Sequence, residues 1–167
     1  ACMTLRFDSG CVGQIQVDFV QRARARNCKI VGLSVDSVSD HTEWSKDIEE
    51  TTGNKGGYPL IGDTDLAVAK LFGMLQSNAT GSAGERTAAD NATVRKLFVI
   101  GPDKKVKLTL TYPMTTGRNF HEVLRVLDSI QLTAEYQVAT PANWKLGDDV
   151  IIVPSVSNEE AVKKFSK

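Results

Sequence analysis

The sequence has few of the residues that hold metal ions. Two histidines and three cysteines occur among its 167 residues, and the cysteines form no Cys-x-x-Cys pair. Structural zinc sites usually need four such ligands at short spacings, so we expect no zinc site and no cofactor. The first ten residues, ACMTLRFDSG, lack the apolar core of a secretion signal, so we expect none. An odd number of cysteines in such a chain indicates reduced thiols and a cytoplasmic protein.

An excess of one charge and long apolar runs are also missing. The 20 basic and 20 acidic residues give a formal net charge of zero, which argues against nucleic acid or an anionic membrane surface as the main partner. No apolar run approaches the roughly 20 residues of a membrane-spanning helix. With 41% hydrophobic and 24% charged residues, the chain has the composition of a globular protein, most simply with one domain.

Apolar residues alternate between helical and strand spacing along the chain. We expect the following segments: a helix at 12–26, a strand at 29–35, a helix at 40–52, a strand at 58–63, a helix at 65–74, a hairpin of strands at 93–101 and 105–113, a helix at 117–131 and an apolar run at 149–154. Small polar residues at 75–92 indicate an exposed, mobile loop. This order predicts an α/β fold with a mixed sheet flanked by helices.

Several stretches together resemble one protein family. LSVDSVSDHTEWSKDI (33–48), the segment 97–154 and NEEAVKKF (158–165) are similar to the one-cysteine peroxiredoxins of the peroxiredoxin 6-like group. TYPMTTGRNFHEVLRVLDSIQLT, within 97–154, is the most specific of these strings. The resemblance implies a thioredoxin-like fold, with a core at 1–139 whose N-terminal strands are incomplete and a C-terminal extension at 140–167.

The resemblance assigns three residues to the reduction of hydroperoxides. Cys11 precedes an amphipathic segment, and a thiol at a helix N-terminus is readily held as a thiolate. Arg95 matches the family's active-site arginine at the start of its strand, and Arg118 matches a second arginine close to that site. From the pattern alone, each arginine is more simply explained as a solvated charge at the end of an element, and only the family resemblance favours a functional role.

The residues around Cys11 depart from the family pattern Pro-x-x-x-Thr-x-x-Cys. Asp8 stands where the threonine belongs and Thr4 where the proline belongs. A carboxylate beside the sulfur raises the thiol pKa, because it opposes a second negative charge. Counting back without gaps from Lys29 places the reactive position on Ser9, two residues before Cys11. The N-terminal part therefore looks incomplete or altered, as in a fragment or a splice product.

Other conspicuous residues have simpler interpretations. The family's second reported activity, a phospholipase, uses a Gly-x-Ser-x-Gly element that this chain lacks, so Asp103 is expected to be only a turn residue. We interpret Cys28 as a small core residue, His41 and His121 as surface residues, and Trp144 as part of a subunit contact.

Two functions remain open at this point. The first is a thiol-dependent peroxidase with Cys11 as nucleophile, a sulfenic acid intermediate and an external thiol reductant such as glutathione. The second is an impaired or truncated peroxiredoxin-like domain that acts as a structural or dimerisation module. Both imply a homodimer without nucleic acid or a membrane span, and the first adds a hydroperoxide substrate.

Overall fold

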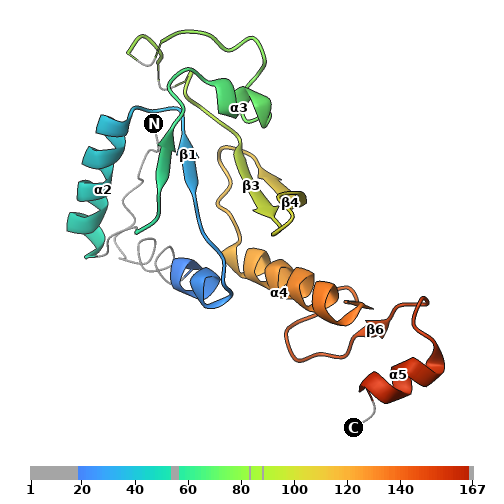
Figure 1. Cartoon of the computed structure of the whole chain (residues 1–167). Coiled ribbons are helices and arrows are strands. Elements are labelled where there is room, and N and C mark those ends of the chain that lie inside the picture. The colour runs from blue at the N-terminus through green and yellow to red at the C-terminus, as the bar shows by residue number, and fades with distance from the viewer. Residues whose placement is uncertain (1–18, 54–56, 83, 88, 166–167) are drawn as a thin grey trace. The chain divides into compact units, whose positions relative to one another are not determined.

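The structure, a computed structural model, describes residues 19–53, 57–82, 84–87 and 89–165. The chain divides into two compact units (Figure 1). Unit 1 comprises residues up to Phe98 together with Leu108–Arg118, and unit 2 comprises Val99–Lys107 and Asn119–Lys167. The predicted boundary between 139 and 140 stays a prediction.

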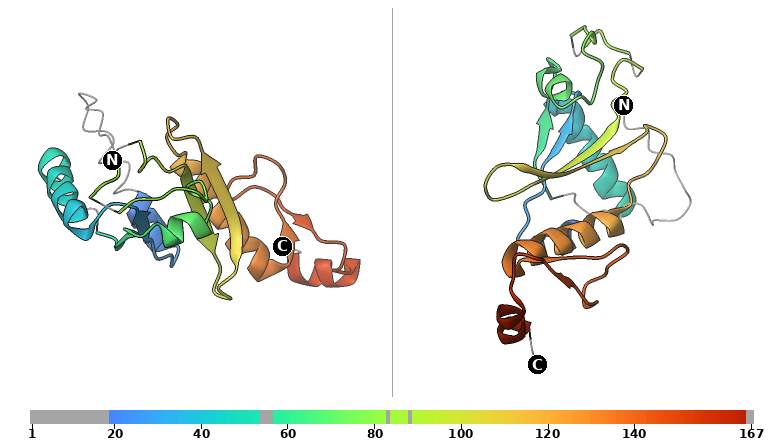
Figure 2. Two further views of the ribbon diagram at one scale, coloured as in Figure 1. Left: turned by 90° about the horizontal axis from the view of Figure 1, so that it is seen from above. Right: turned by 90° about the vertical axis from the view of Figure 1, so that its right-hand side faces the viewer.

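A parallel strand pair with a helical crossover forms part of unit 1. β1 (Gly32–Ser34) pairs with β2 (Leu60–Gly62) in a register that places Leu33 opposite Ile61. Parallel neighbours need a long connection, and α2 (Val38–Thr52) lies within it. α2 packs against β2 (Figures 1 and 2). The predicted strands and helix are confirmed here, although each strand is shorter than its apolar run.

Helix termini in this unit are set by local hydrogen bonds. The helix that includes residues 19–25 is followed by a turn in which Asn27, with a left-handed φ of 56°, lets Cys28 N donate to Ala23 O at 3.0 Å. α2 begins two residues earlier than predicted because Ser37 caps it. The Ser37 hydroxyl accepts from Asp40 N and the Asp40 carboxylate accepts from Ser37 N, both at 3.2 Å.

His41 corrects a sequence-based expectation. The sequence predicts a surface position, but on α2 this residue is only 9% exposed. Neither ring nitrogen has a hydrogen-bond partner within the described residues. The acidic neighbour Asp40 suggests a solvated helix face, whereas packing of α2 turns the imidazole inward. His121 is exposed on its helix, as expected.

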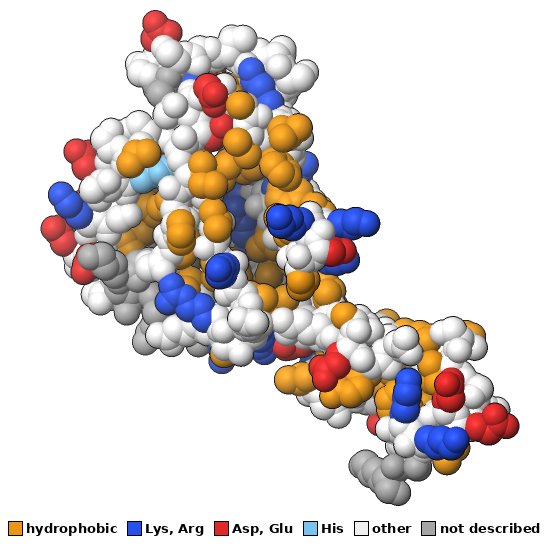
Figure 3. Space-filling model, in the orientation of Figure 1, with side chains coloured by type: hydrophobic (Ala, Val, Ile, Leu, Met, Phe, Trp, Pro, Cys, Tyr) orange, Lys and Arg blue, Asp and Glu red, His pale blue; other side chains and the backbone are white. Residues whose placement is uncertain are grey.

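The core of unit 1 is small. Val35, Leu66 and Ala69 are almost completely buried, and α3 (Ala67–Leu71) contributes Ala69 to this core. The buried Asp63 carboxylate accepts from Val68 N at 3.0 Å and from Ala69 N at 2.7 Å, and so satisfies the first turn of α3. Figure 3 shows many apolar side chains on the surface, so this core covers only part of the apolar area.

A hairpin forms the second sheet of the described chain. β3 (Arg95–Ile100) pairs with β4 (Val106–Tyr112), as predicted. The turn is closed by Gly101 N donating to Lys105 O at 2.9 Å. The Asp103 carboxylate contacts Lys107 Nζ at 2.8 Å, and this hydrogen bond lowers the carboxyl pKa. The interpretation of Asp103 as a turn residue is confirmed.

Unit 2 is built on one long helix. α4 (Phe120–Tyr136) begins at Asn119, whose side chain accepts from Glu122 N, and continues five residues beyond the predicted end. A short antiparallel pair follows, β5 (Val138–Ala139) with β6 (Ile151–Ile152), and then α5 (Asn158–Phe165). Among the described residues the strands form three separate two-stranded sheets, one of them parallel (β1 with β2) and another antiparallel (β5 with β6), and not the single mixed sheet that the sequence predicted.

Candidate functional site

Arg95 is the first residue of β3 and is half-buried. Its Nε donates to Met114 O at 2.8 Å, so the guanidinium is held against the loop that follows β4. In the described part of the chain the two terminal nitrogens of Arg95 make no hydrogen bond. An arginine held by one nitrogen, with its planar fork still available, is suited to bind the oxygens of a small ligand.

Arg118 lies at the end of that same loop, which covers residues 113–118. Its side chain is half-buried, and it belongs to unit 1 together with Arg95. The hairpin brings the start of β3 and the end of β4 to one end of the sheet, since paired antiparallel strands run in opposite directions. The structure thus links Arg95 directly to the loop that carries Arg118.

The predicted nucleophile, Cys11, lies outside the described residues, and so does Cys2. Cys28 is described and half-buried, with Sγ 3.5 Å from Arg26 O. Burial raises the pKa of the Cys28 thiol, and the nearby Arg26 charge offsets this only in part. Cys28 is therefore only half-buried and does not belong to the fully buried core that the sequence interpretation expected, and its raised thiol pKa makes it a weak nucleophile at neutral pH.

Sequence reasoning missed Arg86, which lies in the 75–92 loop. Its guanidinium donates to Asn91 Oδ1, Thr64 O, Gly81 O and Val35 O over 2.7–2.9 Å. The small polar composition of the loop indicated only exposure. No local pattern signals these bonds, because two of the acceptors are more than 20 residues away in the chain.

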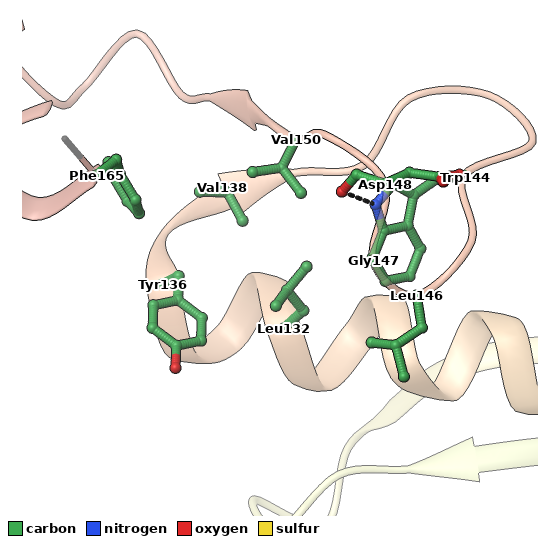
Figure 4. A pocket seen from close by; sticks show the side chains of 9 residues that line it. All are labelled: Leu132, Tyr136, Val138, Trp144, Leu146, Gly147, Asp148, Val150 and Phe165. Atoms are coloured by element: carbon green, nitrogen blue, oxygen red, sulfur yellow. Dashed lines mark hydrogen bonds between the residues drawn. The ribbon is translucent and has the colours of Figure 1, made fainter. Parts of the chain in front are cut away.

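A separate apolar pocket of about 300 Å³ lies within unit 2 (Figure 4). Its lining includes Leu132, Val138, Trp144 and Phe165, but neither candidate arginine. The Trp144 ring is 2% exposed and its Nε1 donates to Asp148 O at 3.1 Å. Because its own chain already covers it, the ring serves intrachain packing, which differs from the expected subunit contact.

The described residues contain no cluster of three or more His, Cys, Asp or Glu side chains arranged for a metal ion. Among the helices of this described part, none has both the length and the apolar character needed to cross a membrane.

Comparison with known families matches most of the chain. Residues 14–109 match the model of the AhpC/TSA family, and residues 129–167 match the model of the C-terminal domain of 1-Cys peroxiredoxin. The 1-Cys peroxiredoxin of Dictyostelium discoideum is 55% identical over 143 residues, which are 85% of this chain and 55% of that protein. The chain thus spans about half the length of this relative.

Two solved structures are similar to the chain along most of its length. A mutant of peroxiredoxin 6 from Arenicola marina has a TM-score of 0.78 at 44% identity, and the match covers 92% of this chain and 68% of that one. The yeast mitochondrial 1-Cys peroxiredoxin, whose thiol is resolved via the glutathione and thioredoxin systems, has a TM-score of 0.78 at 43% identity, and the match covers 95% of this chain and 71% of that one. These similarities confirm the predicted thioredoxin-like α/β fold.

Proposed function

The chain belongs to the 1-Cys peroxiredoxin family, and we propose that it is a thiol-dependent peroxidase for hydrogen peroxide and organic hydroperoxides. The observation that carries this proposal is how the Arg95 guanidinium is hydrogen-bonded. Its Nε is held by Met114 O, and its two terminal nitrogens, which make no hydrogen bond to the described residues, would bind the peroxide oxygens. The match of residues 129–167 to the C-terminal domain model supports the assignment of 140–167 as an extension.

The proposed reaction uses Cys11 as the nucleophile. Its thiolate attacks the terminal oxygen of the peroxide ROOH, an S–O bond forms and the O–O bond breaks, sulfur is oxidised to a sulfenic acid, and RO⁻ leaves and takes up a proton to give ROH. Negative charge moves from sulfur onto the leaving oxygen during this step. Arg95 and Arg118 stabilise that charge through donated hydrogen bonds.

An external thiol completes the cycle. One thiol R′SH condenses with the sulfenic acid to form a mixed disulfide and water, and a second R′SH releases the Cys11 thiol and leaves R′SSR′. We propose glutathione or a similar thiol as reductant, which is supported by the resolution of the yeast mitochondrial relative via the glutathione and thioredoxin systems. This need for reduced thiols also supports a cytoplasmic location.

Selective oxidation of Cys11 tests the function. The reduced chain is mixed with hydrogen peroxide and a sulfenic acid trap, and each cysteine is followed by peptide mass spectrometry. We expect rapid trapping at Cys11, loss of the signal in Cys11→Ser, and oxidation slowed by about 10²–10³-fold in Arg95→Ala, which removes a donor to the developing oxyanion. Arg125→Ala, on α4, is the matched control and keeps the wild-type rate.

Equal, slow oxidation of Cys2, Cys11 and Cys28 would contradict the peroxidase and favour the alternative, a structural or dimerisation module. The homodimer itself is part of the proposal, supported by exposed apolar side chains of unit 2, such as Leu146 and Ile151. Light scattering should give twice the 18.2 kDa of one chain, and a mass of 18.2 kDa would contradict the dimer.

A further inference from the structure

The 75–92 loop is attached to unit 1 through Arg86. The N–H groups of this half-buried guanidinium donate to four acceptors: Asn91 Oδ1 at 2.8 Å, Thr64 O at 2.8 Å, Gly81 O at 2.9 Å and Val35 O at 2.7 Å. Val35 directly follows β1, and Thr64 lies just beyond β2. A single side chain therefore joins both parts of the loop to the ends of two parallel strands.

A second chain of hydrogen bonds leads from the same loop to β1. Asn91 accepts from Arg86 with its Oδ1 and donates through Nδ2 to Asp36 Oδ1 at 3.0 Å. The other carboxylate oxygen, Asp36 Oδ2, accepts from Ser34 Oγ at 2.6 Å. Because Ser34 is the last residue of β1, the order Arg86, Asn91, Asp36, Ser34 is a continuous polar connection to the sheet.

Gly81 makes this arrangement possible. Its φ of +102° is a conformation that side-chain-bearing residues rarely adopt, and its carbonyl accepts from Arg86. A Cβ at this position would lie 3.1 Å from Arg86 Cγ. Gly84, in the same loop, has a φ outside the left-handed region, and a Cβ added there would meet no atom within 4 Å. The loop therefore contains its own control site.

The side chains of Arg86, Asn91 and Asp36, together with Gly81, are called the clamp from here on. The clamp stands close to Arg95 along the chain. Arg95 is four positions after Asn91 in the chain, so its Cα lies within about 14 Å of the Cα of the clamped Asn91. Between them, Val94 N donates to Met74 O at 3.1 Å. The 75–92 loop, which the clamp holds to the end of β1, therefore leads directly into the backbone of Arg95. The Arg95 guanidinium is held separately, by Met114 O.

We propose that the clamp sets the place of the Arg95 guanidinium for the peroxide. This inference rests on the proposed function of Arg95. The clamp residues are positioning residues that act through Arg95 and do not themselves contact the peroxide. Loosening the clamp moves the start of β3 and misplaces the terminal nitrogens of Arg95, which costs rate because charge stabilisation depends on donor geometry.

The first test reads the position of Arg95 without using activity. In the full ¹⁵N-labelled chain, the Nε–H signal of Arg95 is assigned by its loss in Arg95→Lys. We expect this signal to shift and to exchange faster with water in Gly81→Ala and in Arg86→Lys, whose single ammonium cannot reach four acceptors. The signal should stay in place in Gly84→Ala and in Arg125→Lys.

The second test measures the rate of Cys11 oxidation by hydrogen peroxide. We expect Gly81→Ala and Arg86→Lys to be slower by on the order of 10–100-fold, as for a misplaced catalytic donor, with Gly84→Ala unchanged. Adding either clamp substitution to Arg95→Ala should cause little further loss, because the clamp acts through Arg95. A merely structural role would slow the double variants further.

Exchange of two side chains gives a specific rescue. Asn91→Asp places a carboxylate against that of Asp36 and should disturb the Arg95 signal. Asp36→Asn combined with Asn91→Asp restores a donor opposite an acceptor, and we expect it to recover both signal and rate. The proposal that the clamp positions Arg95 is overturned if the Arg95 signal is unchanged in Gly81→Ala and Arg86→Lys. It is also overturned if these two variants are oxidised at the wild-type rate while Arg95→Ala is oxidised slowly. If wild-type Cys11 is not oxidised, the proposed function fails, and the Arg95 signal still decides whether the clamp exists.

Discussion

Two arginines only nine positions apart are used in opposite ways. Arg86, in the 75–92 loop, donates four hydrogen bonds, three of them to backbone carbonyls. Arg95, at the start of β3, donates one hydrogen bond within the described part of the chain, to Met114 O. A guanidinium that gives four of its five N–H groups to its own chain has little capacity left for a ligand and stabilises the fold, whereas a guanidinium fixed by one nitrogen keeps its fork for a ligand.

Arg26 adds a third case to this comparison. Its charge lies near the Cys28 thiol and favours the thiolate, but burial has the larger effect and raises the thiol pKa. An arginine close to a cysteine is therefore insufficient to activate it. The environment of the sulfur decides the outcome, because desolvation penalises the charged thiolate more than the single nearby charge of Arg26 supports it.

The largest expected difference is in stability. Arg86→Ala should lower the free energy of unfolding by about 2 kcal/mol, since it leaves the half-buried side chain of Asn91 and the buried carbonyl of Val35 without their charged donor. Arg95→Ala should lower it by less than about 1 kcal/mol, because one bond is lost. Urea unfolding followed by circular dichroism measures both. Equal losses would remove the distinction between the two arginines.

Asp63→Asn tests a second side chain that stabilises the segment after β2, next to Thr64, whose carbonyl accepts from Arg86. The buried carboxylate receives two backbone N–H groups of α3, and an amide keeps only one good acceptor. We expect a loss of about 1–2 kcal/mol in the free energy of unfolding. The exposed Asp65, which accepts from Ala67 N at 3.2 Å, provides the control Asp65→Asn with a smaller loss. A larger loss in the control would contradict this account of α3.

Ser37→Ala separates the clamp from the neighbouring helix. Ser37 caps α2 one residue after Asp36, and loss of such a cap costs about 1 kcal/mol. Ser39→Ala is the matched control, since the Ser39 hydroxyl lies 2.7 Å from that of Ser37 but does not cap the helix. Thermal unfolding measures both variants. If Ser37→Ala also displaced the Arg95 signal, the clamp would not be independent of α2.

The smallest effect concerns the pH dependence of Cys28. Its thiol pKa is raised above the ordinary value of 9.0, so alkylation by iodoacetamide in the folded chain should be slow at neutral pH and increase to beyond pH 9. The unfolded chain, with the lower pKa, loses its proton first, so this group reduces stability as the pH rises through that range. Labelling of Cys28 as fast in folded as in urea-unfolded protein would contradict the assignment.

Local patterns predicted much of the fold. The apolar runs at 29–35 and 58–63, the helical spacing of 117–131 and the turn residues around Asp103 each correspond to an observed element. Element ends were less accurate, because caps such as Ser37 and the left-handed Gln137 after α4 decide them. The family resemblance located Arg95 and Arg118, which periodicity alone would leave as surface charges.

The sequence by itself therefore determined the order of elements, the family and the candidate arginines, since these depend on neighbours in the chain. Only the tertiary structure decided that, within its described part, Arg86 gives four hydrogen bonds to the chain and Arg95 gives one. The tertiary structure also buries His41 on α2 and buries the Trp144 ring among residues of unit 2. The physical reason is that hydrogen-bond acceptors and burial come from residues distant in sequence, such as Val35 for Arg86, and no local pattern records them.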